Sequence, residues 1–223
     1  MNFEQARSNM VEQQIRTWEV LDQEVLDLLY VVPREEFVPG KHRALAFSDL
    51  EIPLDEGTKA GSSERMWQPK LEARVLQELG VRRTDRVLEV GTGSGYLTAL
   101  LAHRAAQVVS VEIRPELAKL GRGNLERHAA ENVTLELGDA ARGWPRHAPY
   151  DVIVLTGSTP VLPRALLGQL AAGGRLFAVV GEAPIMAARL VECSTAHAFH
   201  DTTLFETVIA PLVNCEQPPR FRF

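Results

Sequence analysis

The sequence predicts an α/β fold: a doubly wound, mostly parallel seven-stranded sheet with a helical cap at its N-terminal side. Three observations predict it. Short β-prone runs alternate with helical runs from residue 85 onward, three glycines at alternate positions follow the first of these runs, and residues 3–79 show irregular helical spacing instead. Alternating strands and helices are typical of a parallel sheet covered on both faces.

The first 80 residues are expected to form the cap. Apolar residues at helical spacing predict two helices, and Pro33 ends the second. Pro69 suits the first turn of a third helix, which Gly80 can end. The expected elements are helices over 3–16, 20–32 and 69–79, an extended segment at 37–39 and a mobile glycine- and serine-rich loop over 55–64.

The rest of the chain supplies the strands of the sheet. The alternation of strands and helices breaks down after residue 180, so the last two strands are predicted to form an antiparallel hairpin at the sheet edge. The strands are expected over 86–90, 108–111, 133–137, 150–155, 175–180, 187–193 and 203–212. The helices between them are expected over 97–105, 115–130 and 162–170, the last ended by Gly173 and Gly174. The predicted division is 1–80 for the cap, 81–213 for the sheet domain and 214–223 for a tail without an assigned role.

Composition narrows the classes of partner. The chain has 223 residues, with 24 Lys and Arg against 29 Asp and Glu, and its formal net charge is -5. This balance disfavours a nucleic-acid partner held by a broad basic surface. Residues 1–14 are polar and no apolar run is long enough to span a bilayer, so neither a signal peptide nor a membrane partner is expected.

The cysteines and histidines predict no metal site. Cys193 and Cys215 form neither a disulfide scaffold nor a Cys-x-x-Cys pair, and two reduced thiols favour a cytoplasmic location. His197 and His200 have a spacing that suits a metal, but no third ligand is evident.

The most informative stretch is 87–96, Val-Leu-Glu-Val-Gly-Thr-Gly-Ser-Gly-Tyr. Three glycines between a strand and a helix let the backbone turn sharply and let a ligand approach it, while the helix N-terminus favours anionic or polar ligand groups. A dinucleotide-binding loop would have glycine where this chain has Tyr96, and no Gly-Lys-Ser/Thr of a P-loop follows. A dinucleotide-dependent oxidoreductase is therefore disfavoured.

Two acidic residues follow the next two strands. Glu112 ends its strand and can accept hydrogen bonds from both hydroxyls of a ribose. Asp139 follows the third strand and could contact an adenine amino group. Taken singly, Glu112 could cap a helix and Asp139 could belong to a turn. Together with the glycine loop, at the carboxyl edge of one sheet, they predict a nucleoside-type cofactor.

These residues resemble the class I S-adenosylmethionine-dependent methyltransferases, whose first and later motifs are similar to residues 87–96, 150–155 and 170–176. Within that superfamily the chain is similar to the protein-L-isoaspartate O-methyltransferases, almost throughout its length to about Val213. The supporting stretches are 10–16, 32–39, 52–54, 68–69, 110–112 and 143–145. The resemblance implies a Rossmann-like fold, S-adenosyl-L-methionine as cofactor with S-adenosyl-L-homocysteine as product, and methylation of the carboxyl group of L-isoaspartyl residues in damaged proteins.

The resemblance also implies a set of site residues. Thr156 is expected near the methyl group of the cofactor, and Trp67 and Gln68 are expected on the acceptor side. These three are the candidate catalytic residues. The expected cofactor-binding residues are Glu89, Gly91, Thr92, Gly93, Gly95, Glu112, Ile113, Asp139, Ala140 and Thr156. The implied partner is a protein or peptide with an isoaspartyl residue, and the enzyme is expected to be a monomer or a homodimer.

One departure from the family pattern lies before Gln68. Where relatives usually have Thr-Ile-Ser, this chain has Arg65-Met66-Trp67, so an indole replaces a hydroxyl. Trp67 could be a packing residue in a rebuilt loop, or it could reshape the acceptor pocket. Two alternatives therefore stay open: a methyltransferase of the same fold with another protein or small-molecule acceptor, and a cofactor-binding homologue that is not an enzyme.

Overall fold

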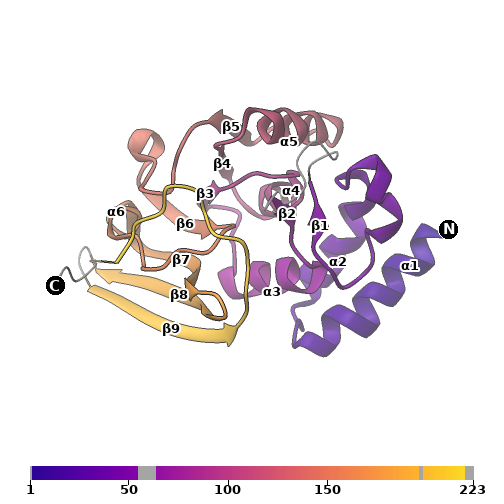
Figure 1. Cartoon of the computed structure of the whole chain (residues 1–223), viewed down its shortest axis with the longest axis horizontal. Coiled ribbons are helices and arrows are strands. Elements are labelled where there is room, and N and C mark those ends of the chain that lie inside the picture. Colours follow the sequence, from indigo (N-terminus) through magenta and orange to yellow (C-terminus); the bar gives the residue numbers. More distant parts are fainter. Residues whose placement is uncertain (1, 55–63, 196–197, 219–223) are drawn as a thin grey trace.

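The computed structural model describes residues 2–54, 64–195 and 198–218. Most of the loop expected over 55–64, as well as His197, therefore lies outside the described residues. Figure 1 shows the sheet beside a group of N-terminal helices, with α1 and α2 at one end of the molecule and the β8–β9 hairpin at the other. Among the described helices, none is long and apolar enough to cross a bilayer.

A seven-stranded sheet forms the centre of the protein, in the order β5-β4-β3-β6-β7-β8-β9. The pairs from β5 to β7 are parallel, while β7–β8 and β8–β9 are antiparallel. The strands are β3 (Arg86–Val90), β4 (Gln107–Glu112), β5 (Val133–Leu137), β6 (Tyr150–Leu155), β7 (Leu170–Glu182), β8 (Ile185–Thr195) and β9 (Ala198–Glu206). The predicted α/β fold and the antiparallel hairpin at the sheet edge are both confirmed.

The helices begin and end close to the expected signals. Pro69 opens α3 and Gly80 ends it in the left-handed conformation, with φ of +50°. Asp22 caps α2 by accepting hydrogen bonds from two backbone N–H groups. The helices are α1 (Phe3–Met10), α2 (Gln23–Val31), α3 (Pro69–Leu79), α4 (Tyr96–Arg104), α5 (Pro115–Arg127) and α6 (Arg164–Leu167), with a two-stranded antiparallel sheet of β1 (Ile52–Pro53) and β2 (Arg65–Met66).

Two apolar clusters cover the two faces of the sheet. Successive strand residues such as Val87 and Leu88 belong to different clusters, as expected from the alternation of side chains along a strand. The larger cluster joins the cap to the sheet, because it contains residues of α2 and α3 together with Tyr96 of α4. The cap is thus packed on the sheet, and the boundary at residue 80 stays a prediction.

The region around α6 corrects the expected helix over 162–170. That helix spans only Arg164–Leu167, and Leu170 already belongs to β7. Gly173 and Gly174 do not end a helix, since they lie inside β7 where its register against β6 shifts. Gly173 has φ of +78°, and a Cβ on Gly174 would lie 2.9 Å from the carbonyl oxygen of Ala171. Both glycines therefore serve a bulge in a strand.

Three further expectations differ in detail. The α-helix expected over 3–16 ends at Met10, and the chain then forms a π-helical turn over Val11–Ile15. Phe37 is not extended, because it closes the 3-10 turn Arg34–Glu36 with φ of -96° and ψ of -12°. The last strand ends at Glu206, and residues 209–212 leave the sheet to run beside Ser158.

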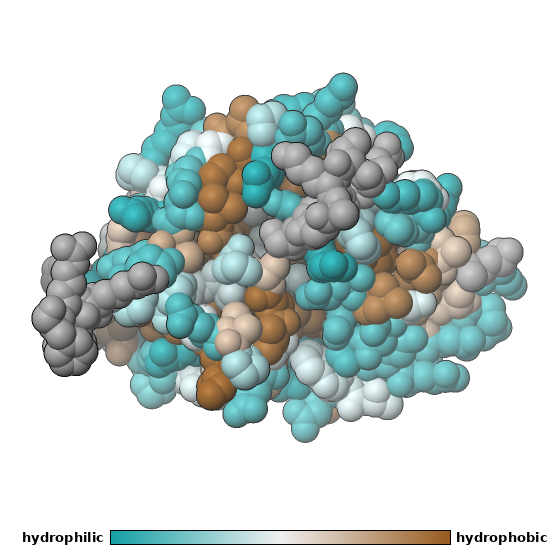
Figure 2. Space-filling view, viewed as in Figure 1, coloured by the Kyte–Doolittle hydropathy of each residue, from teal (hydrophilic) through white to brown (hydrophobic). Residues whose placement is uncertain are grey.

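The surface seen in Figure 2 has hydrophilic residues surrounding several separate apolar areas. No single apolar surface dominates that face.

Candidate functional site

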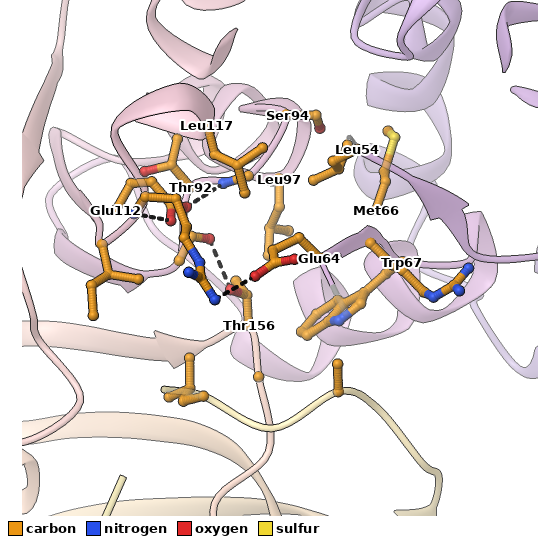
Figure 3. A pocket seen from close by; sticks show the side chains of 18 of the residues that line it. Leu54, Glu64, Met66, Trp67, Thr92, Ser94, Leu97, Glu112, Leu117 and Thr156 are labelled. Atoms are coloured by element: carbon orange, nitrogen blue, oxygen red, sulfur yellow. Dashed lines mark hydrogen bonds and ion pairs between the residues drawn. The ribbon is translucent and has the colours of Figure 1, made fainter. Parts of the chain in front are cut away.

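A pocket lies at the carboxyl ends of β3, β4 and β6, where the sheet meets the cap (Figure 3). Its space measures about 900 Å³ when the open solvent at its mouth is included. Four parts of the chain line it. These are residues 51, 54, 64–67 and 72 of the cap, 89, 91–94 and 97 of the glycine loop region, 112–114 and 117 after β4, and 156–157 with 210–213.

The glycine loop brings its backbone to the pocket at Gly91 and Gly93. Gly91 has φ of +99° and Gly93 has φ of +54°, both in the region that favours glycine. A Cβ on Gly91 would lie 2.2 Å from Oγ1 of Thr156. The Gly91 N–H donates to the carbonyl oxygen of Val111 at 2.8 Å, which fixes the loop against β4. The result is a backbone cradle that a bound molecule can approach closely.

Glu112 ties the end of β4 to this cradle. The residue is only 4% exposed, and its carboxylate accepts two backbone hydrogen bonds, from Gly93 N–H to Oε2 and from Arg114 N–H to Oε1, each 2.9 Å. A carboxylate has about four acceptor positions, so two remain for a ligand. Two adjacent hydroxyl groups, as on a ribose, could donate hydrogen bonds to these two positions.

Glu89 lies beneath the loop and is completely buried. Its Oε2 accepts hydrogen bonds from the hydroxyls of Thr98 and Ser110. Among the described residues, no hydrogen-bond partner reaches its Oε1. Burial raises the pKa of Glu89 to about 8, against the opposing effect of the two hydroxyl donors. The side chain is therefore mainly protonated at neutral pH.

This protonated carboxyl predicts a pH dependence of stability. Between the ordinary pKa of 4.5 and about 8, the unfolded carboxyl is ionised while the folded one keeps its proton. The free energy of unfolding should therefore fall as pH rises through this interval, by up to about 1.4 kcal/mol per pH unit. Glu89→Gln has no proton to lose, so its stability should fall less steeply. Urea denaturation of both proteins at pH 5.5 and 7.5 measures this difference, and parallel pH dependences would contradict it.

Each glutamate that lines the pocket has a compensating partner. Glu112 and Glu89 have those described above. Burial raises the pKa of Glu51, against the opposing charge of Arg65. The three ion pairs are Glu51 with Arg65 at 3.9 Å, Glu64 with Arg114 at 2.7 Å across the pocket (Figure 3), and Glu72 with Arg34. The pocket thus carries little uncompensated negative charge.

The cap forms an apolar wall opposite the glycine loop. Trp67 is 6% exposed and lies with Met66 and Leu54 on one side of the pocket, facing Glu112 and Thr92 on the other (Figure 3). Gln68 does not line the pocket, and its backbone carbonyl instead accepts hydrogen bonds at the start of α3. Of the two predicted acceptor-side residues, the structure brings only Trp67 to the site.

Three predicted cofactor residues are not part of the pocket lining. Gly95 packs against α5, since a Cβ there would lie 3.2 Å from the carbonyl oxygen of Gly121. Ala140 is buried in the core. Asp139 accepts hydrogen bonds from the Ala141 N–H and the Asn214 side chain, and it does not line the pocket. The expected contacts of these three with a cofactor stay predictions. The predicted residues that do line the pocket are Glu89, Gly91, Thr92, Gly93, Glu112, Ile113 and Thr156.

The sequence analysis did not predict that residues 210–213 line the pocket. Residues 210–213 line the pocket because Ser158 holds this segment, donating to the Ala210 carbonyl oxygen and accepting from the Leu212 N–H. Gly157 leaves room for it, since a Cβ there would lie 2.9 Å from Leu212. Gly157 after a buried strand was the available signal, but nothing local connects it to residue 212. In the part of the chain that the structure describes, no group of three or more His, Cys, Asp or Glu could hold a metal ion.

The sheet, the glycine cradle and the acidic residue at the end of the next strand form the arrangement expected of an S-adenosylmethionine-dependent methyltransferase. The model of the family "Protein-L-isoaspartate(D-aspartate) O-methyltransferase" matches residues 5–217. The chain therefore belongs to this family, whose members are S-adenosyl-L-methionine-dependent enzymes.

Individual relatives agree with this assignment. The chain is 43% identical to a protein-L-isoaspartate O-methyltransferase of Methanoculleus marisnigri over 78% of this chain and 77% of that protein. It is 36% identical to one of Koribacter versatilis over 93% of this chain and 90% of that protein. A solved protein-L-isoaspartate O-methyltransferase superposes with a TM-score of 0.79 at 26% identity, covering 93% of this chain and 66% of that one.

A second solved structure extends the comparison of the fold. It is a Plasmodium falciparum protein in complex with S-adenosyl-L-homocysteine, with a TM-score of 0.78 over 96% of this chain and 99% of that one. At 18% identity this likeness establishes the fold alone.

Proposed function

We propose that this protein transfers a methyl group from S-adenosyl-L-methionine to the free carboxyl group of L-isoaspartyl residues in damaged proteins. The observation that carries the proposal is the extent of the family match. The matched residues, 5–217, include both the glycine loop and the cap residues that line the pocket. A protein or peptide with an isoaspartyl residue is the corresponding substrate.

The residues of the cofactor side fit this molecule. The backbone of Gly91 and Gly93 leaves space for it, and Glu112 offers acceptor positions to its ribose hydroxyls. Ile113 supplies apolar surface beside Glu112. Thr156 directs its hydroxyl toward the backbone carbonyl oxygens of Val90 and Gly91, at 2.8 Å from each, and so closes the base of the cradle. When bound, S-adenosyl-L-methionine supplies an electrophilic methyl group.

The acceptor needs no general base from this chain. A carboxyl group with an ordinary pKa near 4 is already ionised at neutral pH. The chain's task is to orient that carboxylate and to limit repulsion around it. The protonated Glu89 and the ion-paired Glu51, Glu64 and Glu72 reduce the repulsion that five ionised glutamates would cause.

The apolar wall serves to exclude water. Trp67, Met66 and Leu54 come from the cap, while Leu97 and Leu212 face the pocket from the other side. A dry site strengthens the electrostatic interactions that orient a charged acceptor.

A methylation assay tests the proposal. Purified protein is incubated with methyl-labelled S-adenosyl-L-methionine and a peptide that contains one isoaspartyl residue. We expect a base-labile methyl ester on this peptide and none on the matched aspartyl peptide. Equal labelling of both peptides, or none above background, would reject the function. Titration of the same preparation with S-adenosyl-L-homocysteine separates two causes of a negative result. Binding without methylation would mean that the peptide is not the acceptor, whereas no binding would mean that the cofactor site is not functional.

Trp67 favours a second candidate, in which the same chemistry serves a different acceptor. Under the primary proposal the indole excludes water, so Trp67→Ser should lower the isoaspartyl turnover rate by about tenfold or more and destabilise the fold through the cavity it leaves. Under the second candidate the indole blocks isoaspartyl peptides, so the same variant should gain activity. Trp18→Ser, the same change at a residue outside the pocket lining, is the control.

The oligomeric state and the location remain predictions. We propose a monomer or homodimer in the cytoplasm with no nucleic-acid partner, in keeping with the net charge of -5. Light scattering of the purified protein measures the first of these directly.

A further inference from the structure

Arg34 lies at the centre of the cap and is completely buried. It occupies the 3-10 turn Arg34–Glu36 that follows α2. Its guanidinium donates hydrogen bonds in three directions: Nε to the Ala46 carbonyl oxygen at 2.9 Å, NH2 to the Trp67 carbonyl oxygen at 2.6 Å, and NH1 to the carboxylate of Glu72. The guanidinium carbon also lies 5.1 Å from the ring centroid of Tyr96.

These contacts join three separate segments of the cap. Ala46 precedes β1, Trp67 follows β2, and Glu72 lies in the first turn of α3. Trp67 and Glu72 line the pocket, whereas Arg34 itself does not. Any effect of Arg34 on an acceptor must therefore pass through the residues that it holds.

The buried ion pair is poorly explained by stability alone. The desolvation of two charges offsets much of their attraction, and apolar side chains of similar volume are often as stable in such places. Burial lowers the pKa of Arg34 to about 10, which still leaves the group charged at neutral pH. What an apolar pair could not provide is a fixed position for the Trp67 backbone and a counter-charge for Glu72.

We propose that Arg34 is a positioning residue for the methyl acceptor: it fixes the Trp67 backbone at the pocket wall, and its charge neutralises Glu72 so that an acceptor carboxylate can lie nearby. This inference rests on the proposed function for the identity of the acceptor. It extends that function, because it names a guanidinium outside the pocket as the group that holds Trp67 and Glu72 in place beside the acceptor.

Arg34→Lys separates charge from geometry. Lysine keeps the positive charge but lacks the planar fork that serves three acceptors at once. We expect the KM for the isoaspartyl peptide to rise by about tenfold or more, while the Kd for S-adenosyl-L-homocysteine stays within about twofold. Among the described residues, the hydrogen bonds of Arg34 go to Ala46, Trp67 and Glu72, and none goes to Gly91, Gly93 or Glu112. Arg43→Lys is the matched control, because that guanidinium lies over the ring of Phe3 outside the pocket lining.

A second readout does not need catalysis. The chain has three tryptophans, so Trp18→Phe with Trp144→Phe leaves Trp67 as the sole indole reporter. In that background we expect Arg34→Lys to shift the emission of Trp67 to longer wavelength and to raise its quenching by acrylamide at least about twofold. If the wild-type protein failed to methylate the peptide, the proposed function would fall while this readout still decided the role of Arg34.

The results that would overturn the proposal are equally distinct. They are an unchanged peptide KM with unchanged Trp67 emission, or equal losses of peptide and S-adenosyl-L-homocysteine binding. Should Arg34→Lys fail to fold, the double variant Arg34→Met/Glu72→Met replaces the ion pair by apolar side chains. It should fold and show the same rise in peptide KM and the same exposure of Trp67, and wild-type values in both would reject the positioning role.

Discussion

Glu112→Gln is expected to raise the Kd for S-adenosyl-L-homocysteine by about 30-fold. Both carboxylate oxygens of Glu112 accept a backbone N–H, one from Gly93 and one from Arg114. A glutamine must direct its own NH2 group at one of these N–H donors, whichever way its amide turns. The variant thus loses a charge-assisted hydrogen bond, worth about 2 kcal/mol, and disturbs the loop that carries the ligand.

Calorimetric titration of the wild type and the variant measures this effect. Glu116→Gln is the matched control, because it removes the same charge from an exposed position in the first turn of α5. Its Kd should stay within about twofold of the wild type. A Glu112→Gln variant that bound as tightly as this control would remove Glu112 from the ligand site.

Gly91→Ala is expected to abolish measurable binding of S-adenosyl-L-homocysteine and to lower the Tm by several degrees. The added Cβ would meet Oγ1 of Thr156 at 2.2 Å, and alanine would have to adopt φ of +99°. A backbone conformation of this kind costs about 1–3 kcal/mol in a residue other than glycine. The collision adds to that cost because the Thr156 hydroxyl is held by two backbone carbonyl oxygens.

Two further variants divide this effect into its causes. Gly173→Ala adds a Cβ at φ of +78° with no atom within 4 Å, so it measures the conformational cost without a collision. Thr156→Ala in the Gly91→Ala background removes Oγ1, and the nearest remaining atom of residue 156 is its Cβ at 3.6 Å. This double variant should recover part of the lost stability. No recovery would mean that the collision is not the cause.

The glycine-loop side of the pocket was predictable because its signals are local. Gly91, Gly93 and Glu112 each follow a β-prone run within a few residues, and the carboxyl ends of parallel strands meet at one edge. Gly80 and Pro69 likewise marked the ends of α3 correctly, since both act on the backbone next to them.

The contacts that hold the cap side of the pocket were not predictable in the same way. Arg34 and Glu72 are separated by 38 positions, and no spacing rule connects a 3-10 turn to the first turn of a helix. The start of β7 was misassigned for a related reason. Leu170 stands in a helix-prone run, but its pairing with Tyr150 outweighs that local preference.

The wall formed by residues 210–213 has a consequence for how the protein is made. A chain grows from its N-terminus at about 5–20 residues per second. All seven strands therefore leave the synthesis machinery before the segment that Ser158 holds against the pocket. In the order of synthesis, the complete sheet thus precedes the segment that closes one side of its ligand pocket.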